Sequence, residues 1–263
     1  MQQKFIFGRV IETGSWVHQL DPRSKMTAMA LFAVIVVMLQ SLTDFIVVTA
    51  TSQIVLYSTR IKLTTYWRAV RPLKYLMLFI FLFQIFLESG GELLVSWGPI
   101  QIYSGGILTA VFTVWRMFLF VSFTALLTFT TAPAKLTQGL EDILKPLSIF
   151  RISAQKIALM LTIALRFIPT ILEETQRIVK AQASRGADLK ELPWKDKAKT
   201  MIALLVPVTV CAFRRAEDLV NSMESRGYQL DAPRSKYFIL TWQKQDTLFL
   251  SIFVLLGILV FFI

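Results

Sequence analysis

The chain has 263 residues, of which 55% are hydrophobic, and a mean hydropathy of +0.59. This composition excludes an ordinary soluble domain and indicates a membrane protein that crosses the bilayer several times. The net charge of +11 must therefore lie in loops and in a polar segment, and the single cysteine, Cys211, excludes an intrachain disulfide.

The first 131 residues alternate polar segments with apolar runs. Residues 1–25 are a polar leader, in which Asp21 is expected to cap a helix that has Pro22 at its first position. We expect four membrane helices within residues 26–131, centred on four apolar runs at 26–39, 45–57, 75–87 and 107–129. The first two runs are short for a crossing, so they predict either a tight helical hairpin or one long re-entrant element.

The loops between these runs differ in charge. The 60–74 loop carries five basic residues together with aromatic residues, whereas the 88–106 loop has two glutamates and no Lys or Arg. Two Gly-Gly pairs, at 90–91 and 105–106, are interpreted as turns at the ends of the second loop. By the positive-inside rule, the leader and the 60–74 loop face the cytoplasm, and the 88–106 loop faces outward.

The segment 132–243 is predicted to be a cytoplasmic and interfacial coupling domain. It opens with a short amphipathic helix, which suits a membrane surface or a neighbouring helix. Two long helices follow, over 152–183 and 198–224, and Pro193-Trp194 in the linker between them is a candidate helix restart. Each has an apolar first half and a charged second half, with Pro169 or Pro207 expected to kink it between the two.

A last apolar run, within residues 244–263, predicts a final crossing that leaves the C-terminus outside. The predicted fold class is thus an all-α integral membrane protein. It has about five transmembrane helices, plus a coupling domain of one short amphipathic and two long helices.

Both long helices end on the same tripeptide, with the two arginines 41 positions apart. The two copies are Ser184-Arg185-Gly186 and Ser225-Arg226-Gly227. In one interpretation they are ordinary helix ends, with Gly as the left-handed cap and Arg complementing the helix dipole. In the other, the arginines are paired cationic pegs presented to a partner, because a guanidinium offers a rigid fork of donors. The two interpretations are compatible, since a glycine that ends the helix leaves the arginine before it free to dock.

Residues that could carry chemistry are few. The only histidine is His18, which is interpreted as a loop residue, and no phosphate-binding glycine loop occurs. We therefore expect no enzyme, no cofactor and no metal. Arg116 lies near the middle of a predicted span, where a charge is either functional or a packing device that bonds backbone carbonyls. Trp115, next to it, could cover the guanidinium.

The sequence resembles the transmembrane T component of energy-coupling factor transporters over nearly its whole length. The resemblance is carried by three features, the leader pattern Gly8…Ser15…His18…Leu20-Asp21-Pro22-Arg23-Ser24-Lys25, the segment Leu165-Arg166-Phe167-Ile168-Pro169 and the twin Ser-Arg-Gly ends. The similarity is greatest to the shared (group II) type, which serves several vitamin-binding partners.

This resemblance implies a non-catalytic scaffold in a vitamin importer of the bacterial cell membrane. Two cytoplasmic ATP-binding subunits would each receive one arginine tip. A small membrane S component would bind the vitamin and lean against the two long helices, which cross. The residues that match the family's coupling motif are Ser184, Arg185, Gly186, Ser225, Arg226 and Gly227.

Three other classes of function fit the sequence less well. A solute-conducting permease or channel subunit predicts polar residues along the spans, and apart from Arg116 and scattered Ser, Thr and Gln they are missing. An intramembrane enzyme is disfavoured by the lack of His, Cys or paired acids in the spans. A basic anchor for nucleic acid is unnecessary, because topology explains the charge, so we expect the bilayer and no nucleic acid as a partner.

Overall fold

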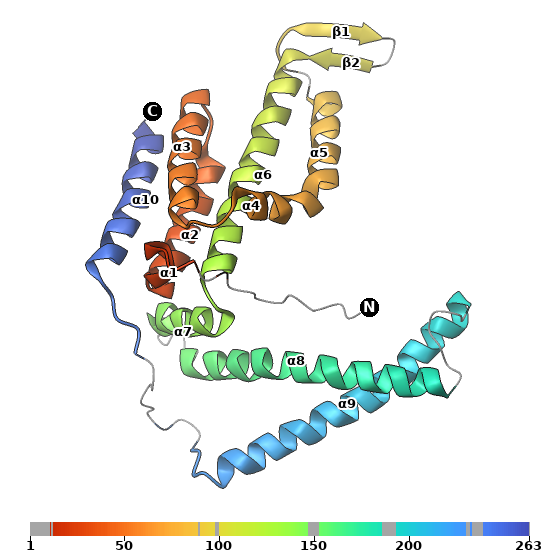
Figure 1. The fold of residues 1–263 in the computed structure, drawn as a ribbon. Coiled ribbons are helices and arrows are strands. Elements are labelled where there is room, and N and C mark those ends of the chain that lie inside the picture. The colour runs from red at the N-terminus through yellow and green to blue at the C-terminus, as the bar shows by residue number, and fades with distance from the viewer. Residues whose placement is uncertain are drawn as a thin grey trace. The chain divides into compact units, whose positions relative to one another are not determined.

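The computed structural model describes residues 11, 13–88, 90–97, 100–146, 153–185, 193–229, 232 and 239–262. Nearly all of them are helical (Figure 1), which confirms the all-α class. In chain order the described helices are α1 (Trp16–Gln19), α2 (Pro22–Met38), α3 (Leu42–Ser58), α4 (Leu63–Val70), the 3-10 helix η1 (Arg71–Leu73), α5 (Lys74–Leu87), α6 (Ser104–Thr130), α7 (Pro133–Leu144), α8 (Ala154–Ser184), α9 (Trp194–Glu224) and α10 (Lys244–Phe262). Strands β1 (Leu93–Trp97) and β2 (Ile100–Tyr103) pair antiparallel between α5 and α6.

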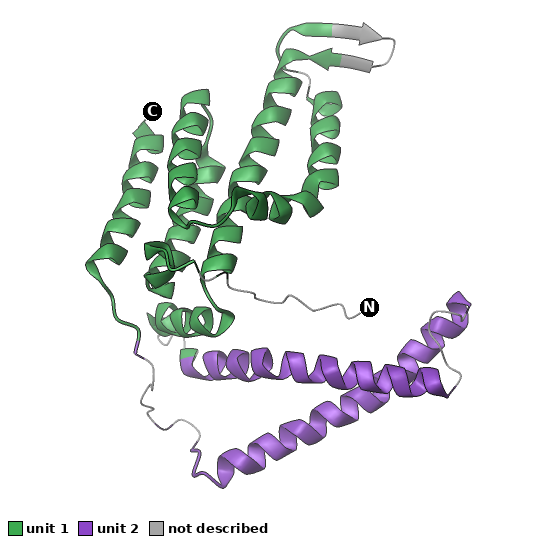
Figure 2. Cartoon of the chain, viewed as in Figure 1, with its two compact units in different colours: residues 1–154, 240–263 green, residues 155–239 purple. Residues whose placement is uncertain are grey.

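The chain divides into two compact units (Figure 2). Unit 1 consists of residues 1–154 and 240–263, and unit 2 consists of residues 155–239. Unit 1 contains the membrane-type helices and α7, whereas unit 2 is built from α8 and α9. The helix α7 packs against α2, where Gly139 lies against Pro22.

Three helical segments of the described chain are long and apolar enough to cross a bilayer. They are Leu63–Leu87, Ser104–Thr130 and Lys244–Phe262, and α3 is a shorter apolar helix of 17 residues. The helix α2 also has 17 residues, at the lower end of the range for a crossing. These helices are consistent with the membrane class.

The first two apolar runs form separate helices, as the hairpin prediction expected. The helix α2 begins at Pro22, and the Asp21 carboxylate accepts a hydrogen bond of 2.8 Å from the Arg23 backbone N–H. Asp44, which lies between the two runs, closes a capping box with Ser41 at the start of α3. Local cap chemistry therefore sets both starts.

The predicted basic loop at 60–74 is wrong, because this segment is helical as α4 and η1. Tyr66 and Val70 are buried four residues apart on one face of α4, and the cations point to the exposed side. The Tyr66 hydroxyl lies 2.9 Å from Thr59 Oγ1. The segment is thus a short amphipathic helix whose apolar positions follow the helical period.

The outer segment also differs from prediction, because strands β1 and β2 pair there and Gly105-Gly106 is no turn. Both glycines lie in the first turn of α6, where they meet the backbone near the end of α5. A Cβ on Gly106 would lie 3.1 Å from the Ile85 carbonyl oxygen, and one on Gly105 would clash with the Gly90 carbonyl. Their function is therefore close helix packing rather than chain reversal.

The core of unit 1 is an aromatic cluster shared by α2, α6 and α10. The rings of Phe32 and Phe123 stack with centroids 4.2 Å apart, and Phe253 packs edge-on against both. All three side chains are buried. Aromatic pairs in these geometries add to the burial energy, so they fix α10 against helices that are distant in sequence.

The two long helices of unit 2 each span 31 residues, which corresponds to about 46 Å. Pro169 and Pro207 lie inside these helices without interrupting them. Pro193 precedes the first residue of α9, so the predicted restart at Pro193-Trp194 is confirmed.

Candidate functional site

The tip of α9 ends in a Schellman motif around Gly227. The Tyr228 backbone N–H donates to the Met223 carbonyl at 3.0 Å, and the Gly227 N–H donates to the Glu224 carbonyl at 2.9 Å. Gly227 has φ = +72°, the left-handed conformation that this cap requires. The predicted glycine cap is confirmed here, and it leaves the Arg226 side chain exposed at the end of the helix.

The tip of α8 is described up to Arg185. The Arg185 backbone N–H donates to the Gln182 carbonyl at 3.0 Å, and the Ser184 hydroxyl donates to the Lys180 carbonyl at 3.1 Å. The Arg185 side chain is exposed, like that of Arg226. Gly186 lies outside the described residues, so the cap predicted there stays a prediction.

The helices α8 and α9 cross within unit 2 (Figure 1), as the resemblance implied. They are joined by an ion pair in which Arg215 Nη2 lies 2.8 Å from Glu174 Oε2. Around this pair, Ile171 of α8 and Val208, Cys211 and Ala212 of α9 line a small shared recess. The pair joins residues 41 positions apart, the same spacing as the two tip arginines.

The apolar first halves of the long helices are largely exposed. Exposed residues there include Met160, Leu161, Leu165 and Ile168 of α8 and Met201, Ile202, Leu205, Val206 and Phe213 of α9. A surface of this kind on one unit marks contact with lipid or with a partner chain. Unit 2 thus carries apolar surface along its helices and a cation at each helix end.

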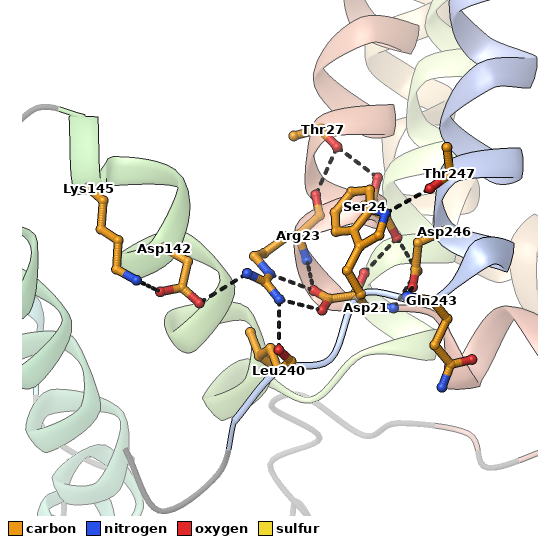
Figure 3. Close-up of polar contacts among 11 residues, drawn as sticks. Asp21, Arg23, Ser24, Thr27, Asp142, Lys145, Leu240, Gln243, Asp246 and Thr247 are labelled. Carbon is orange, nitrogen blue, oxygen red and sulfur yellow. Dashed lines mark hydrogen bonds and ion pairs between the residues drawn. The ribbon is translucent and has the colours of Figure 1, made fainter. Parts of the chain in front are cut away.

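The leader motif forms a second polar centre, inside unit 1 (Figure 3). Arg23 lies between two carboxylates, with Nη2 at 2.9 Å from Asp21 Oδ2 and Nη1 at 3.5 Å from Asp142 Oδ2. Its Nη2 also donates to the Leu240 carbonyl at 2.9 Å. The hydrogen bond with Asp21 raises the pKa of Arg23 above its ordinary value. Arg23 therefore holds together the start of α2, the segment that precedes α10 and the helix α7.

Asp246 completes this centre, and the sequence analysis did not identify it. Its Oδ1 accepts hydrogen bonds from the Asp21 backbone N–H at 2.7 Å and from the Ser24 hydroxyl at 2.8 Å. Its Oδ2 accepts a hydrogen bond of 2.8 Å from the Gln243 backbone N–H, and this bond caps the start of α10. Asp246 is 1% exposed. An acid in the first turn of a helix is the signal that could have found it.

Arg116 connects α6 with the end of α2. Its Nη2 donates to the Leu39 carbonyl at 2.6 Å, and the guanidinium lies 6.0 Å from the ring centre of Phe45. Leu39 is the C-cap of α2, so the guanidinium satisfies a carbonyl that the helix leaves free. Trp115, which was expected to cover Arg116, instead donates its indole N–H to Thr49 Oγ1 at 3.0 Å. This geometry favours the packing interpretation.

Comparison with known proteins connects these features to one family. The sequence profile of the cobalt transport protein family CbiQ matches residues 13–237. The chain is 39% identical to the energy-coupling factor transporter transmembrane protein EcfT of Streptococcus equi subsp. equi, over 98% of this chain and 96% of the relative. It is 38% identical to EcfT of Listeria innocua, over 98% of both chains, and 36% identical to EcfT of Bacillus subtilis, over 100% and 99%.

The chain belongs to the T-component family of energy-coupling factor transporters. The predicted family is therefore confirmed, and the chain is a transmembrane component of a transporter. The matched range contains Asp21, Arg23 and Asp142 of the leader centre, Arg116 and both arginine tips, and it ends before Asp246.

The single histidine of this T component closes the leader. Its Nδ1 lies 2.7 Å from the Ser15 hydroxyl, and its Nε2 lies 2.8 Å from the Ile11 carbonyl oxygen. These partners fit a neutral ring that accepts at Nδ1 and donates at Nε2. His18 thus lies in the short helix α1 and not in a loop, so that part of the prediction is wrong, and its ring nitrogens are satisfied within the leader.

Lys25 is a buried cation just before the first apolar run of this T component. Its Nζ donates to Thr131 Oγ1 at 3.1 Å and to the carbonyls of His18 and Thr130 at 3.4 Å. Burial, and next the positive charge of Lys135, lower the pKa of Lys25 to about 8. Asp246 and Asp21 oppose this shift only in part. Lys25 links the start of α2 to the end of α6.

The lowered pKa of Lys25 predicts a stability that rises with pH. Between about pH 8 and 10.5 the unfolded chain binds a proton at Lys25 that the folded chain has lost. The free energy of unfolding then increases with pH, by at most about 1.4 kcal/mol per pH unit. We expect the melting temperature of the wild type, relative to Lys25→Met, to increase from pH 7.5 to 9.5 in detergent. A constant difference between the two proteins would contradict this account of Lys25.

A substitution at Arg116 should affect stability rather than transport. Arg116→Met leaves the Leu39 carbonyl without its donor, so we expect a loss of roughly 1–3 kcal/mol in the free energy of unfolding. Uptake per folded molecule should stay unchanged. Thermal melting in detergent, together with uptake normalised to folded protein, checks both. Normal melting combined with lost uptake would instead make Arg116 a functional residue.

Proposed function

We propose that this T component is the energy-coupling scaffold of a bacterial importer. It transmits the ATP-driven motion of two cytoplasmic ATP-binding subunits to a membrane S component that binds a vitamin. The observation that carries this proposal is the pair of exposed arginine tips, Arg185 and Arg226, on two crossed helices. Ser184, Gly186, Ser225 and Gly227 flank them in the proposed coupling site.

The chemistry of the tips suits a protein groove. A guanidinium keeps its charge and offers five donors in a fixed fork, which matches carboxylates or backbone carbonyls of a partner. Neither tip arginine forms an ion pair within the described part of the chain. Two tips of the same sequence suit two ATPase subunits of similar shape, one for each tip.

The exposed apolar halves of α8 and α9 are the proposed contact surface for the membrane partner. Their surface suits the S component and the membrane, while the charged halves lead to the tips. In this proposal residues 1–25 are a cytoplasmic leader, 26–131 form the first four membrane helices, 132–243 are the cytoplasmic coupling domain and 244–263 form the last membrane helix. The T component itself is non-catalytic, it is of the shared type, and its C-terminus lies outside the cell membrane.

Purification in a mild detergent tests this function. We expect two ATP-binding subunits and one small hydrophobic S component to co-purify with the T component, and the reconstituted complex to need ATP for vitamin uptake. A chain that purifies alone and transports solute without ATP in liposomes would overturn the scaffold proposal. That result would support the alternative of a solute-conducting permease or channel subunit.

A further inference from the structure

A groove of about 760 Å³ opens in unit 1 between α6 and the α4–α5 segment. It lies beside α6, which contacts both α5 and α4, near the place where the chain passes from α4 into α5 (Figure 1). Its walls are almost wholly apolar. They include Val70, Met77 and Phe81 on one side and Val114, Trp115 and Phe118 on the other.

The backbone itself builds this groove. The last turns of α5 approach α6 closely, because Gly106 meets the carbonyls of Gln84, Ile85 and Glu88. The first turns of α5, which begin at Lys74, line the groove instead. At that end the chain passes through η1, which contains Pro72 and joins α5 to α4. The groove between α5 and α6 therefore results from the path of the backbone and does not depend on the conformation of a single side chain.

Two cations stand at the η1 end of the groove. Arg71 and Lys74 are its only charged lining residues, and both are exposed. Neither forms an ion pair with any side chain that the structure describes. The Lys74 ammonium lies 4.6 Å from the ring centre of Tyr75. A long apolar wall with free cations at one end complements a ligand that has an apolar tail and an anionic head.

We propose that this groove binds one anionic phospholipid. Its acyl chain lies along the apolar wall, and Arg71 and Lys74 hold its headgroup phosphate. Cations at a membrane surface attract anionic lipids, and the charges of Arg71 and Lys74 provide this attraction at one end of the groove.

The size of the groove favours a lipid over a helix of a partner subunit. Its volume falls in the range of small-ligand pockets, about 300–1,000 Å³. A helix with its side chains is about 10 Å wide and packs along a broad face. In a bilayer an apolar groove of this kind is filled by hydrocarbon rather than by water. The proposal does not depend on the coupling function of the tips.

Native mass spectrometry of the purified transporter complex tests the lipid site. The probes are phosphatidylglycerol and phosphatidylcholine with the same acyl chains. The test variant is Arg71→Gln with Lys74→Gln. The matched control is Lys62→Gln with Arg68→Gln, which removes two exposed cations of the same segment that do not line the groove.

We expect the wild type to retain phosphatidylglycerol in preference to phosphatidylcholine. The test variant should lower this retention roughly 30-fold, and the control should leave it unchanged. Equal retention of the two lipids, or no loss in the test variant, would overturn the proposal. Val114→Trp fills the groove and should also displace the lipid. If Val114→Trp instead releases a membrane subunit while phosphatidylglycerol stays bound, the groove belongs to a partner helix.

Discussion

Replacing both Arg185 and Arg226 with alanine should abolish coupled uptake while the chain still folds in the membrane. If each guanidinium is a buried, hydrogen-bonded charge in the complex, each loss weakens assembly with the ATP-binding subunits by roughly 2–5 kcal/mol. The chain itself should keep its stability, because both side chains are exposed and lie beyond the last helical turn. Co-purification of the ATP-binding subunits and uptake in liposomes are the two measurements.

The matched control for the double replacement is Arg177→Ala with Arg214→Ala. Both residues are exposed arginines of α8 and α9, but they lie before the tips. The control should co-purify with the ATP-binding subunits as well as the wild type does. Normal co-purification of the Arg185/Arg226 variant would reject the coupling role, and the two tripeptides would then be ordinary helix ends. The two single variants show whether the tips contribute equally.

Replacing Asp246 with alanine should cause the largest loss of stability within unit 1. The change leaves the backbone N–H groups of Asp21 and Gln243 without their acceptor, while the Ser24 hydroxyl keeps the Asp21 carbonyl at 2.8 Å. An unsatisfied donor costs about 1–3 kcal/mol, and the two donors share one site, so we expect a total of roughly 2–4 kcal/mol. Thermal melting in detergent measures the change.

Two further variants separate hydrogen bonding from charge at Asp246. Asp246→Asn keeps one acceptor oxygen and should melt between the wild type and the alanine variant. Asp196→Ala removes an exposed acid from the first turn of α9 and should have little effect. If Asp246→Ala melts like the wild type, the leader centre does not hold α10 to α2.

Features that depend on near neighbours could be predicted from the sequence. Asp21 caps the start of α2 through its carboxylate, and Pro193 directly precedes the start of α9 at Trp194. Gly227 supplies the left-handed cap because few other residues adopt that conformation without strain. Each of these predictions needed only a few adjacent residues.

Features that depend on distant contacts could not be predicted in the same way. Asp246 bonds Asp21 and Ser24 across 225 and 222 positions, and its own surroundings show only an acid at a helix start. Gly105 and Gly106 were interpreted as a turn, because the close approach of α5 that requires them is a tertiary contact. For the 60–74 segment the sequence did contain a helical pattern, since Tyr66 and Val70 are spaced by one helical turn. The loop was predicted because five basic residues lie in the same segment.

The Glu174–Arg215 pair gives unit 2 the geometry of a balanced lever. Arg185 lies 185 − 174 = 11 residues beyond Glu174, and Arg226 lies 226 − 215 = 11 residues beyond Arg215. At 1.5 Å per residue both arms measure about 16 Å. A scissor-like rotation about this pivot moves the two tips through arcs of equal length. If two ATPase subunits close symmetrically on these tips, as proposed above, equal arms would let them move both tips by the same distance.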